Sequence, residues 1–112
     1  MTPTMFVMVF KAANARRSEL LNAKSAEYAR NGDKLSNFKK AAGMDGTTPE
    51  HALWGMNRKH IISITDMVND LQYEGKMAPM DKWREKLDDL RNYCDLLEAC
   101  LIERATNVDA QE

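Results

Sequence analysis

The sequence predicts an all-α protein, a four-helix bundle-like fold with helices in the order long, short, long, long, and two observations support this fold class. The 112 residues include only five glycines and three prolines, and so few turn-forming residues favour long helices over many short strands. Apolar residues recur at spacings of three and four, which is the period of a helix with one buried face. The length fits one domain, expected at residues 1–105, followed by a flexible polar tail at 106–112.

The first helix is expected to run from Pro3 to about Arg30. Proline is favoured in the first turn of a helix, because its missing N–H group costs no hydrogen bond there. An apolar side of imperfect period follows, with Phe6 and Phe10 near its beginning. These rings are large for the end of a helix. We expect them either to pack under the last helix or to form a subunit contact.

A turn is predicted after this helix by Asn-Gly-Asp at positions 31–33, because glycine adopts positive φ without steric cost and asparagine tolerates it. A short helix is expected from Lys34 to Ala42, with the carboxylate of Asp33 accepting hydrogen bonds from its free N–H groups. Gly43 is expected to end this helix.

The third helix has the clearest start, with Thr48 as the N-cap and a helix expected over Pro49 to about Tyr73, before Gly75. Its apolar stripe includes His60. A histidine on such a stripe is more often a buried side chain with one hydrogen-bond partner than a ligand. Lys59 belongs to an adjoining polar line, which on its own is typical of a solvated face.

The last helix is expected from Met80 to about Glu103 and has the most regular apolar spacing in the chain. Asp89 and Asn92 stand three residues apart beside its apolar stripe. Paired oxygen ligands at that spacing can hold Mg²⁺ together with a phosphate, because Mg²⁺ takes few protein carboxylates and completes its shell with water and phosphate oxygens. Most acidic pairs on helices nevertheless face solvent.

Charge is unevenly distributed along the chain, although the net charge is only -1. Residues 1–42 carry eight Lys and Arg against three Asp and Glu, whereas residues 43–112 carry eight against fourteen. The two parts could form a joint site for an anionic ligand and a metal, or they could pair with each other across helix interfaces, which is the commoner arrangement. The balance gives no reason to expect direct binding of nucleic acid.

Targeting and redox signals point to the cytoplasm. No apolar run approaches the length of a membrane span, so no membrane association is expected, and the N-terminal residues lack a signal-peptide pattern. Cys94 and Cys100 are six residues apart, on different faces of the predicted helix, and cannot bridge each other within it. Free thiols of this kind suggest a reducing compartment.

The corner between the first two helices gathers unlike side chains that could bind a ligand. They are Lys24, Glu27, Tyr28, Asp33, Asn37 and Phe38. Loops held by rigid helices often carry binding sites, because they bring such groups together. The alternative is a plain helical corner with the two aromatic rings packed beneath it, and this is the commoner case.

Three segments together resemble a known group of proteins: AKSAEYARNGDKLSNFKKAA, TTPEHALWGMNRKHIISITDMV and WREKLDDLRNYCDLLEACL. Their order is similar to that in a group of small bacteriophage proteins, which are distantly similar to the all-α nucleoside-triphosphate pyrophosphohydrolases (the MazG and dimeric dUTPase type) and to nucleotide-modification-associated domains. The resemblance covers roughly residues 20–103. It implies a cytoplasmic protein of an infected bacterial host that binds a nucleotide or another phosphorylated small molecule.

The resemblance also implies roles for particular residues. The implied ligand-binding residues are Lys24, Glu27, Tyr28, Asp33, Asn37, Phe38, Lys59 and His60, and the implied Mg²⁺ ligands are Asp66, Asp89 and Asn92. The sequence departs from the pyrophosphohydrolase pattern, in which each of two helices carries a pair of acidic residues. Asn92 offers an amide, which carries no charge and is a poorer ligand for Mg²⁺ than a carboxylate.

Several interpretations of function stay open at this point. The protein could be a Mg²⁺-dependent nucleoside triphosphate pyrophosphohydrolase, a non-catalytic sink for a host nucleotide signal, or an inhibitor that binds a host defence protein in the manner of an anti-CRISPR. A helical bundle with no ligand is the plainest alternative. A homo-oligomer is expected in each case, because four helices of this size leave more apolar surface than one small core can cover.

Overall fold

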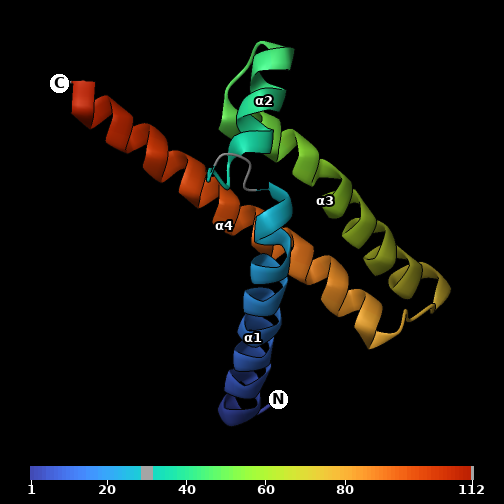
Figure 1. Ribbon diagram of the computed structural model, residues 1–112. Coiled ribbons are helices and arrows are strands. Elements are labelled where there is room, and N and C mark those ends of the chain that lie inside the picture. The colour runs from blue at the N-terminus through green and yellow to red at the C-terminus, as the bar shows by residue number, and fades with distance from the viewer. Residues whose placement is uncertain (29–31, 112) are drawn as a thin grey trace.

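The protein consists of four helices, as the computed structural model shows, and the predicted all-α fold class is confirmed (Figure 1). The backbone is described for residues 1–28 and 32–111, and the side chains for residues 1–20, 22 and 32–107. The elements are α1 (Pro3–Tyr28), α2 (Ser36–Asp45), α3 (Pro49–Glu74) and α4 (Met80–Gln111). None of the elements within the described backbone is a strand.

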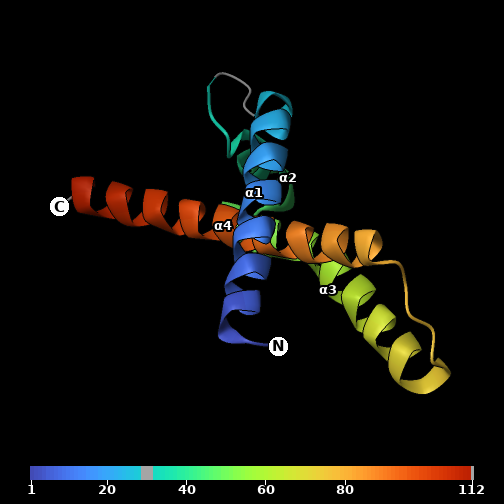
Figure 2. The ribbon, with the colours of Figure 1, turned by 90° about the horizontal axis from the view of Figure 1, so that it is seen from below.

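α3 and α4 form an antiparallel hairpin, and α2 packs beside the start of α3 and the second half of α4 (Figure 1). α1 crosses α4 near its middle, and the first turns of α1 extend past this crossing in both views (Figures 1 and 2). The chain is therefore an open arrangement of crossing helices, more extended than a compact four-helix bundle, with principal extents of 52 × 31 × 27 Å.

α3 begins and ends as its sequence predicts. The Thr48 side chain accepts a hydrogen bond from the backbone N–H of His51 at 3.3 Å, and Pro49 occupies the first helical position. Gly75 ends the helix with φ of 65°, and its N–H group donates to the carbonyl of Asp70. This left-handed closure satisfies a carbonyl group that the helix leaves free.

The boundaries of α2 differ from the prediction at both ends. Asp33 accepts a hydrogen bond from Leu35 N–H at 2.9 Å, so residues 33–35 form a turn and the helix begins at Ser36. At the other end, Gly43 lies inside the helix and Gly46 closes it with φ of 65°. The prediction that Gly43 stops the helix was wrong, because either glycine permits a left-handed stop and only the second one adopts it.

α4 continues to Gln111, beyond the predicted end near Glu103. The sequence contains no glycine or proline after Pro79, so no residue in this segment breaks the helix. The Thr106 hydroxyl group donates a hydrogen bond to the Ile102 carbonyl at 2.8 Å, so the polar group of this side chain is satisfied within the helix. The domain boundary at residue 105 stays a prediction.

The apolar core lies where α2, α3 and α4 meet. Leu35, Phe38, Leu53 and Cys100 are buried together, and they are covered by three partly buried side chains, Tyr93, Leu96 and Leu97. Leu53 is completely buried. The residues of α1 with described side chains add only Ala13 to the buried apolar set. Within the described residues, no helix is both long enough and apolar enough to cross a membrane.

Candidate functional site

The side chains of Phe38, His60 and Asp89, from three helices, lie around Tyr93, and we call these four residues the Tyr93 cluster. The Phe38 ring of α2 approaches the Tyr93 ring of α4 edge-on, with 6.3 Å between the ring centroids. The His60 ring of α3 lies on another side of Tyr93, with centroids 5.1 Å apart. His60 Nδ1 is 3.8 Å from a carboxylate oxygen of Asp89. Segments far apart in the sequence are thus joined by contacts through a single tyrosine.

The members of the Tyr93 cluster differ in exposure. Phe38 is only 4% exposed and belongs to the apolar core, so its ring is surrounded by protein. The side chains of His60 and Asp89 are 13% and 20% exposed, and Tyr93 is half-buried. The cluster therefore has a buried apolar base and a polar edge that reaches the surface between α3 and α4. Ligand sites are typically lined by apolar and aromatic side chains with a few polar groups that fix the orientation of the ligand.

A groove of about 680 Å³ between α1 and the first half of α4 has Asp89 in its wall, so this carboxylate belongs to both the groove and the Tyr93 cluster. We call it the α1–α4 groove. Six of its eight lining residues carry a charge. The lining residues are Ala12, Arg16, Leu20, Asp81, Arg84, Glu85, Asp88 and Asp89. The volume falls within the range typical of small-molecule sites.

Ion pairs already occupy part of this groove. Arg16 donates to both carboxylate oxygens of Asp88, at 2.9 and 3.3 Å, and Arg91 donates to the same carboxylate at 2.9 Å. The hydrogen bond from Arg16 to Asp88 raises the pKa of the guanidinium above its ordinary value. Arg84 lies 3.7 Å from Asp81. Four carboxylates therefore face two arginines in the groove, which leaves it with an excess of negative charge.

A second pair of contacts joins α1 to α4 beside the groove. Arg17 donates to the side-chain oxygen of Asn92 at 3.4 Å and forms an ion pair with Asp95. The basic first third of the chain thus pairs with acidic residues of the last helix. These contacts agree with the second of the two arrangements that the charge distribution allowed.

The predicted ligand residues fall into three groups. The side chains of Lys24, Glu27 and Tyr28 lie outside the described residues. Asn37 is half-buried in the first turn of α2, and Lys59 is exposed on α3 next to His60. Of the predicted ligand residues, Phe38 and His60 are brought together, because both rings contact Tyr93. Lys59 is adjacent to His60 in the sequence.

Asp33 holds the turn before α2 through its carboxylate. Its carboxylate accepts hydrogen bonds from the Lys39 ammonium group at 2.7 Å and from the Leu35 N–H group at 2.9 Å. These two donors hold the pKa of Asp33 below its usual value. Lys39 also pairs with Glu103, and both carboxylates raise its pKa. This clamp ties the turn before α2 to the second half of α4.

The predicted Mg²⁺ ligands, all of which have described side chains, do not converge on one point. Asp66 is exposed on α3, whereas Asn92 is buried and turns its oxygen to Arg17. A guanidinium at that position opposes a cation bound to the same oxygen. Among the side chains at 1–20, 22 and 32–107, no group of three or more His, Cys, Asp or Glu is arranged to hold a metal ion. Asp89 is the predicted metal ligand that lies in a groove.

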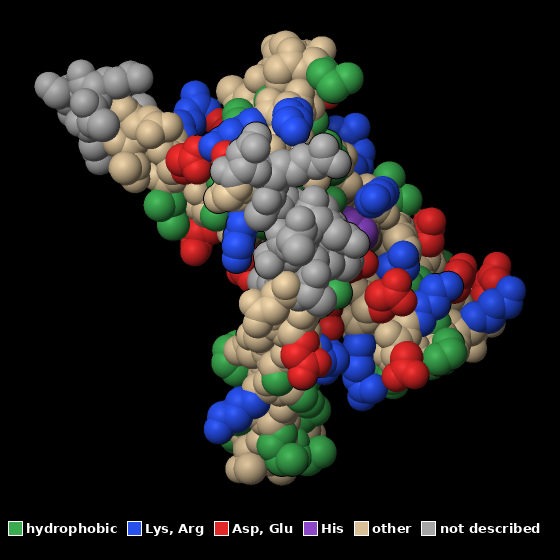
Figure 3. Space-filling model, in the orientation of Figure 1, with side chains coloured by type: hydrophobic (Ala, Val, Ile, Leu, Met, Phe, Trp, Pro, Cys, Tyr) green, Lys and Arg blue, Asp and Glu red, His purple; other side chains and the backbone are tan. Residues whose placement is uncertain are grey.

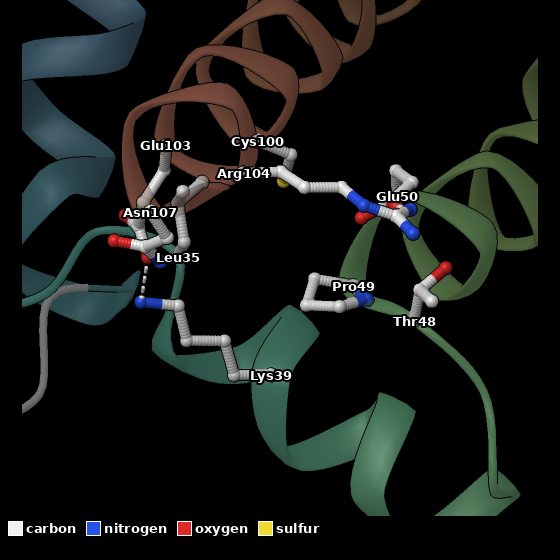
Figure 4. A pocket seen from close by; sticks show the side chains of 9 residues that line it. All are labelled: Leu35, Lys39, Thr48, Pro49, Glu50, Cys100, Glu103, Arg104 and Asn107. Atoms are coloured by element: carbon white, nitrogen blue, oxygen red, sulfur yellow. Dashed lines mark hydrogen bonds and ion pairs between the residues drawn. The ribbon is translucent and has the colours of Figure 1, made fainter. Parts of the chain in front are cut away.

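A further cavity, of about 360 Å³, lies between α2, the start of α3 and the second half of α4 (Figure 4). Its two cations are each paired, Lys39 with Glu103 and Arg104 with Glu50. Cys100 forms part of the apolar lining, and burial raises the pKa of its thiol. Its two cations and two carboxylates balance, whereas the α1–α4 groove has an excess of carboxylates that could hold a metal ion.

Sequence reasoning missed both arginines and three of the four acids that line the α1–α4 groove. Arg16, Asp81, Arg84, Glu85 and Asp88 were not predicted as site residues, although the unequal charge of the two parts of the chain was a signal that such pairs form. Spacing along one helix cannot show which residues of another helix they face. Comparison with protein-family models, curated proteins and solved structures gives no match to this chain.

Proposed function

We propose that the protein binds a phosphorylated nucleotide together with Mg²⁺, at the junction of the Tyr93 cluster and the α1–α4 groove. The observation that carries the proposal is the position of Asp89. Its carboxylate lies beside His60 and also in the wall of the groove. An aromatic surface for a base and a charged surface for phosphates are thus connected through one side chain.

The chemistry of each part suits a different part of such a ligand. The half-buried His60 and Tyr93 rings are tilted by 48° to each other, and either ring could stack on a nucleobase next to hydrogen-bonding atoms. Arg16 and Arg84 in the groove can form charge-assisted hydrogen bonds to phosphate oxygens. In this arrangement the base would lie toward α3 and the phosphates toward α1.

The charge of the groove explains why a metal ion would accompany the ligand. A free phosphate ester would be repelled by the excess of carboxylates in the groove wall. Mg²⁺ would offset that repulsion, because it typically binds one or two protein carboxylates and completes its shell with phosphate oxygens and water. Asp89 and Glu85 supply oxygen ligands of the required kind. A cluster of three protein ligands is not needed for this mode of binding.

Binding can be tested with a panel of nucleoside triphosphates and cyclic nucleotides, titrated calorimetrically with and without Mg²⁺. Asp89→Asn should weaken Mg²⁺-dependent binding by about tenfold or more, because it removes a charged metal ligand. Glu98→Gln is the matched control, since Glu98 is an exposed carboxylate of the same helix outside the groove. If none of the nucleotides binds in either condition, the proposal is wrong.

The fate of the ligand separates an enzyme from a sink. Each mixture is analysed by chromatography before and after heat denaturation of the protein. A monophosphate and pyrophosphate would identify a hydrolase. Depletion of a nucleotide that returns intact on heating would identify a sink. The side chain of Asn92, which is turned to Arg17 and away from a role as a metal ligand, favours the sink.

A further inference from the structure

The first turns of α1 expose apolar side chains on every face. We call residues 1–11 the N-terminal arm. Six consecutive residues of this arm are between 46% and 66% exposed: Met5, Phe6, Val7, Met8, Val9 and Phe10. Consecutive residues of a helix point in directions about 100° apart, so six of them cover its whole circumference. Hydrophobic side chains gather at this protruding end of the molecule (Figure 3).

A helix of this kind is not stable as a solvated element. Helices that are apolar all round are normally enclosed within a protein core, because water gives them no favourable face. Soluble monomers rarely expose contiguous apolar patches larger than a few hundred square ångströms. These six side chains are left uncovered by the other described helices, and the hydrogen bonds given between α1 and α4 lie further along, at Arg16 and Arg17.

The total surface gives an independent measure of what is uncovered. The chain exposes 8167 Å², whereas a compact monomer of 12.8 kDa exposes about 6,300 Å². Its radius of gyration is 16.9 Å, compared with about 13 Å for a compact domain of this length. The excess is about 1,900 Å² per chain. Stable homodimers bury on the order of 1,000–2,500 Å² per subunit, so the excess matches what one stable dimer contact covers.

The same chain also offers a surface that could receive the arm. Trp54, Ile61 and Val68 are spaced by seven on α3, which places them on one face, and they are 44%, 38% and 49% exposed. A two-fold symmetric interface requires both complementary surfaces on one molecule. Charge does not oppose the contact, because Lys11 is the single charged side chain among residues 1–15 and the whole chain carries only -1.

We propose that a second copy of this chain covers the N-terminal arm, with the arm of each subunit packed on the Trp54–Ile61–Val68 face of its partner. The interface would enclose Phe6 and Phe10. This inference is independent of nucleotide binding, because it uses neither the Tyr93 cluster nor the α1–α4 groove.

The test is the mass of the protein in solution, measured by light scattering after size exclusion over a range of micromolar concentrations. The wild-type chain should have twice the monomer mass of 12.8 kDa. Phe6→Glu combined with Phe10→Glu should raise the dissociation constant about 100-fold or more, because each change places a charge in an apolar interface. Ile61→Glu should weaken assembly in the same direction. Met44→Glu is the control, since Met44 is 88% exposed on α2, and it should leave the mass unchanged.

Circular dichroism spectra should show that all variants keep their helices, as glutamate is a good helix former on an exposed surface. A wild-type chain that stays monomeric at these concentrations would overturn the proposal. So would an oligomer that is unaffected by the two arm substitutions or by Ile61→Glu. Binding of a monomeric wild-type chain to phosphatidylcholine vesicles, lost in the arm variant, would instead identify a lipid surface as the occupant and would also overturn it.

Discussion

α2, α3 and α4 are held together differently from the way α1 is attached to them. α2, α3 and α4 meet around buried apolar side chains, among them Leu53 and Phe38. α1 reaches α4 mainly through arginines, with Arg16 bound to Asp88 and Arg17 to Asp95 within the described residues. Apolar burial contributes about 25 cal/mol per Å² and is not screened by salt. Ion pairs with at least one solvent-accessible partner typically contribute less, and they weaken as salt rises.

This difference indicates that the two parts of the chain contribute unequally to its stability. The α2–α4 unit carries most of the stability of the chain, and α1 is a weakly attached helix whose apolar end is exposed. A site formed between α1 and α4 therefore depends on the less stable of the two attachments. Helices in this position are suited to ordering on ligand binding or on assembly.

The largest effect should come from breaking the apolar core. Leu53 is 0% exposed and contacts the centre of the α2–α4 unit, so Leu53→Ala should lower the free energy of unfolding by about 3 kcal/mol. The loss combines reduced burial with the cavity that the truncated side chain leaves. Urea unfolding followed by far-ultraviolet circular dichroism measures it. Met44→Ala, at an exposed site, should change the value by less than about 0.5 kcal/mol, and equal losses in the two variants would contradict the comparison.

A smaller effect should follow from loosening α1. Asp88 is 5% exposed and accepts from both Arg16 and Arg91, so Asp88→Asn should cost about 1–2 kcal/mol. Hydrogen exchange should speed up in residues 12–20 more than in residues 93–100. Concentrated salt should reproduce part of this change in the wild-type chain, since it screens the same ion pairs.

The matched control is Asp81→Asn, because the side chain of Asp81 is 99% exposed on the same helix. It should leave exchange at residues 12–20 unchanged. Faster exchange throughout the α2–α4 unit in Asp88→Asn would show instead that the two attachments are not separable.

A third prediction contrasts two buried positions one turn apart on α3. Asn57 is as fully buried as Leu53, but neither atom of its side-chain amide has a hydrogen-bond partner among the described residues. Truncation therefore removes an unfavourable buried polar group as well as packing contacts. Asn57→Ala should change the free energy of unfolding by no more than about 1 kcal/mol, in contrast to Leu53→Ala. A loss close to that of Leu53→Ala would indicate that the amide is satisfied in solution.

Local signals in the sequence predicted much of the fold. Thr48 and Pro49 predicted the start of α3, and Gly75 predicted its end, because capping depends on neighbouring residues alone. The end of α2 was mispredicted where Gly43 and Gly46 compete for one role. The end of α4 was mispredicted because falling hydrophobicity does not stop a helix when no breaker follows.

The candidate site was less predictable because it depends on contacts between helices. Phe38, His60 and Asp89 were all identified from the sequence, but Tyr93 joins them only through the way α2, α3 and α4 pack. The pairing of Arg16 with Asp88 depends on where α1 crosses α4. Helical periodicity fixes which residues share a face of one helix, and it leaves open which residue of another helix they meet.

The smallest effect concerns the clamp between Asp33 and Lys39, which lies on the surface of the α2–α4 unit. Both side chains are more than one-third exposed, so solvent screens the pair and its contribution should be smaller than that of Asp88. The Lys39 ammonium and the Leu35 N–H group lower the pKa of Asp33 in the folded protein. A carboxylate of this kind stabilises the fold above its unfolded pKa, near 3.9, and loses that effect as pH falls through its lower folded pKa.

The pH dependence can be isolated with a double-mutant cycle of Asp33→Asn and Lys39→Gln. The coupling free energy between the two positions should be favourable at pH 7 and should diminish below about pH 4, as Asp33 becomes protonated. Equilibrium unfolding of the four proteins at each pH measures it. Coupling that persists undiminished in strong acid would show that the contact does not depend on the charge of Asp33. The turn before α2 would then rest on the uncharged part of the α2–α4 unit, and charge pairs would matter chiefly at the α1 attachment.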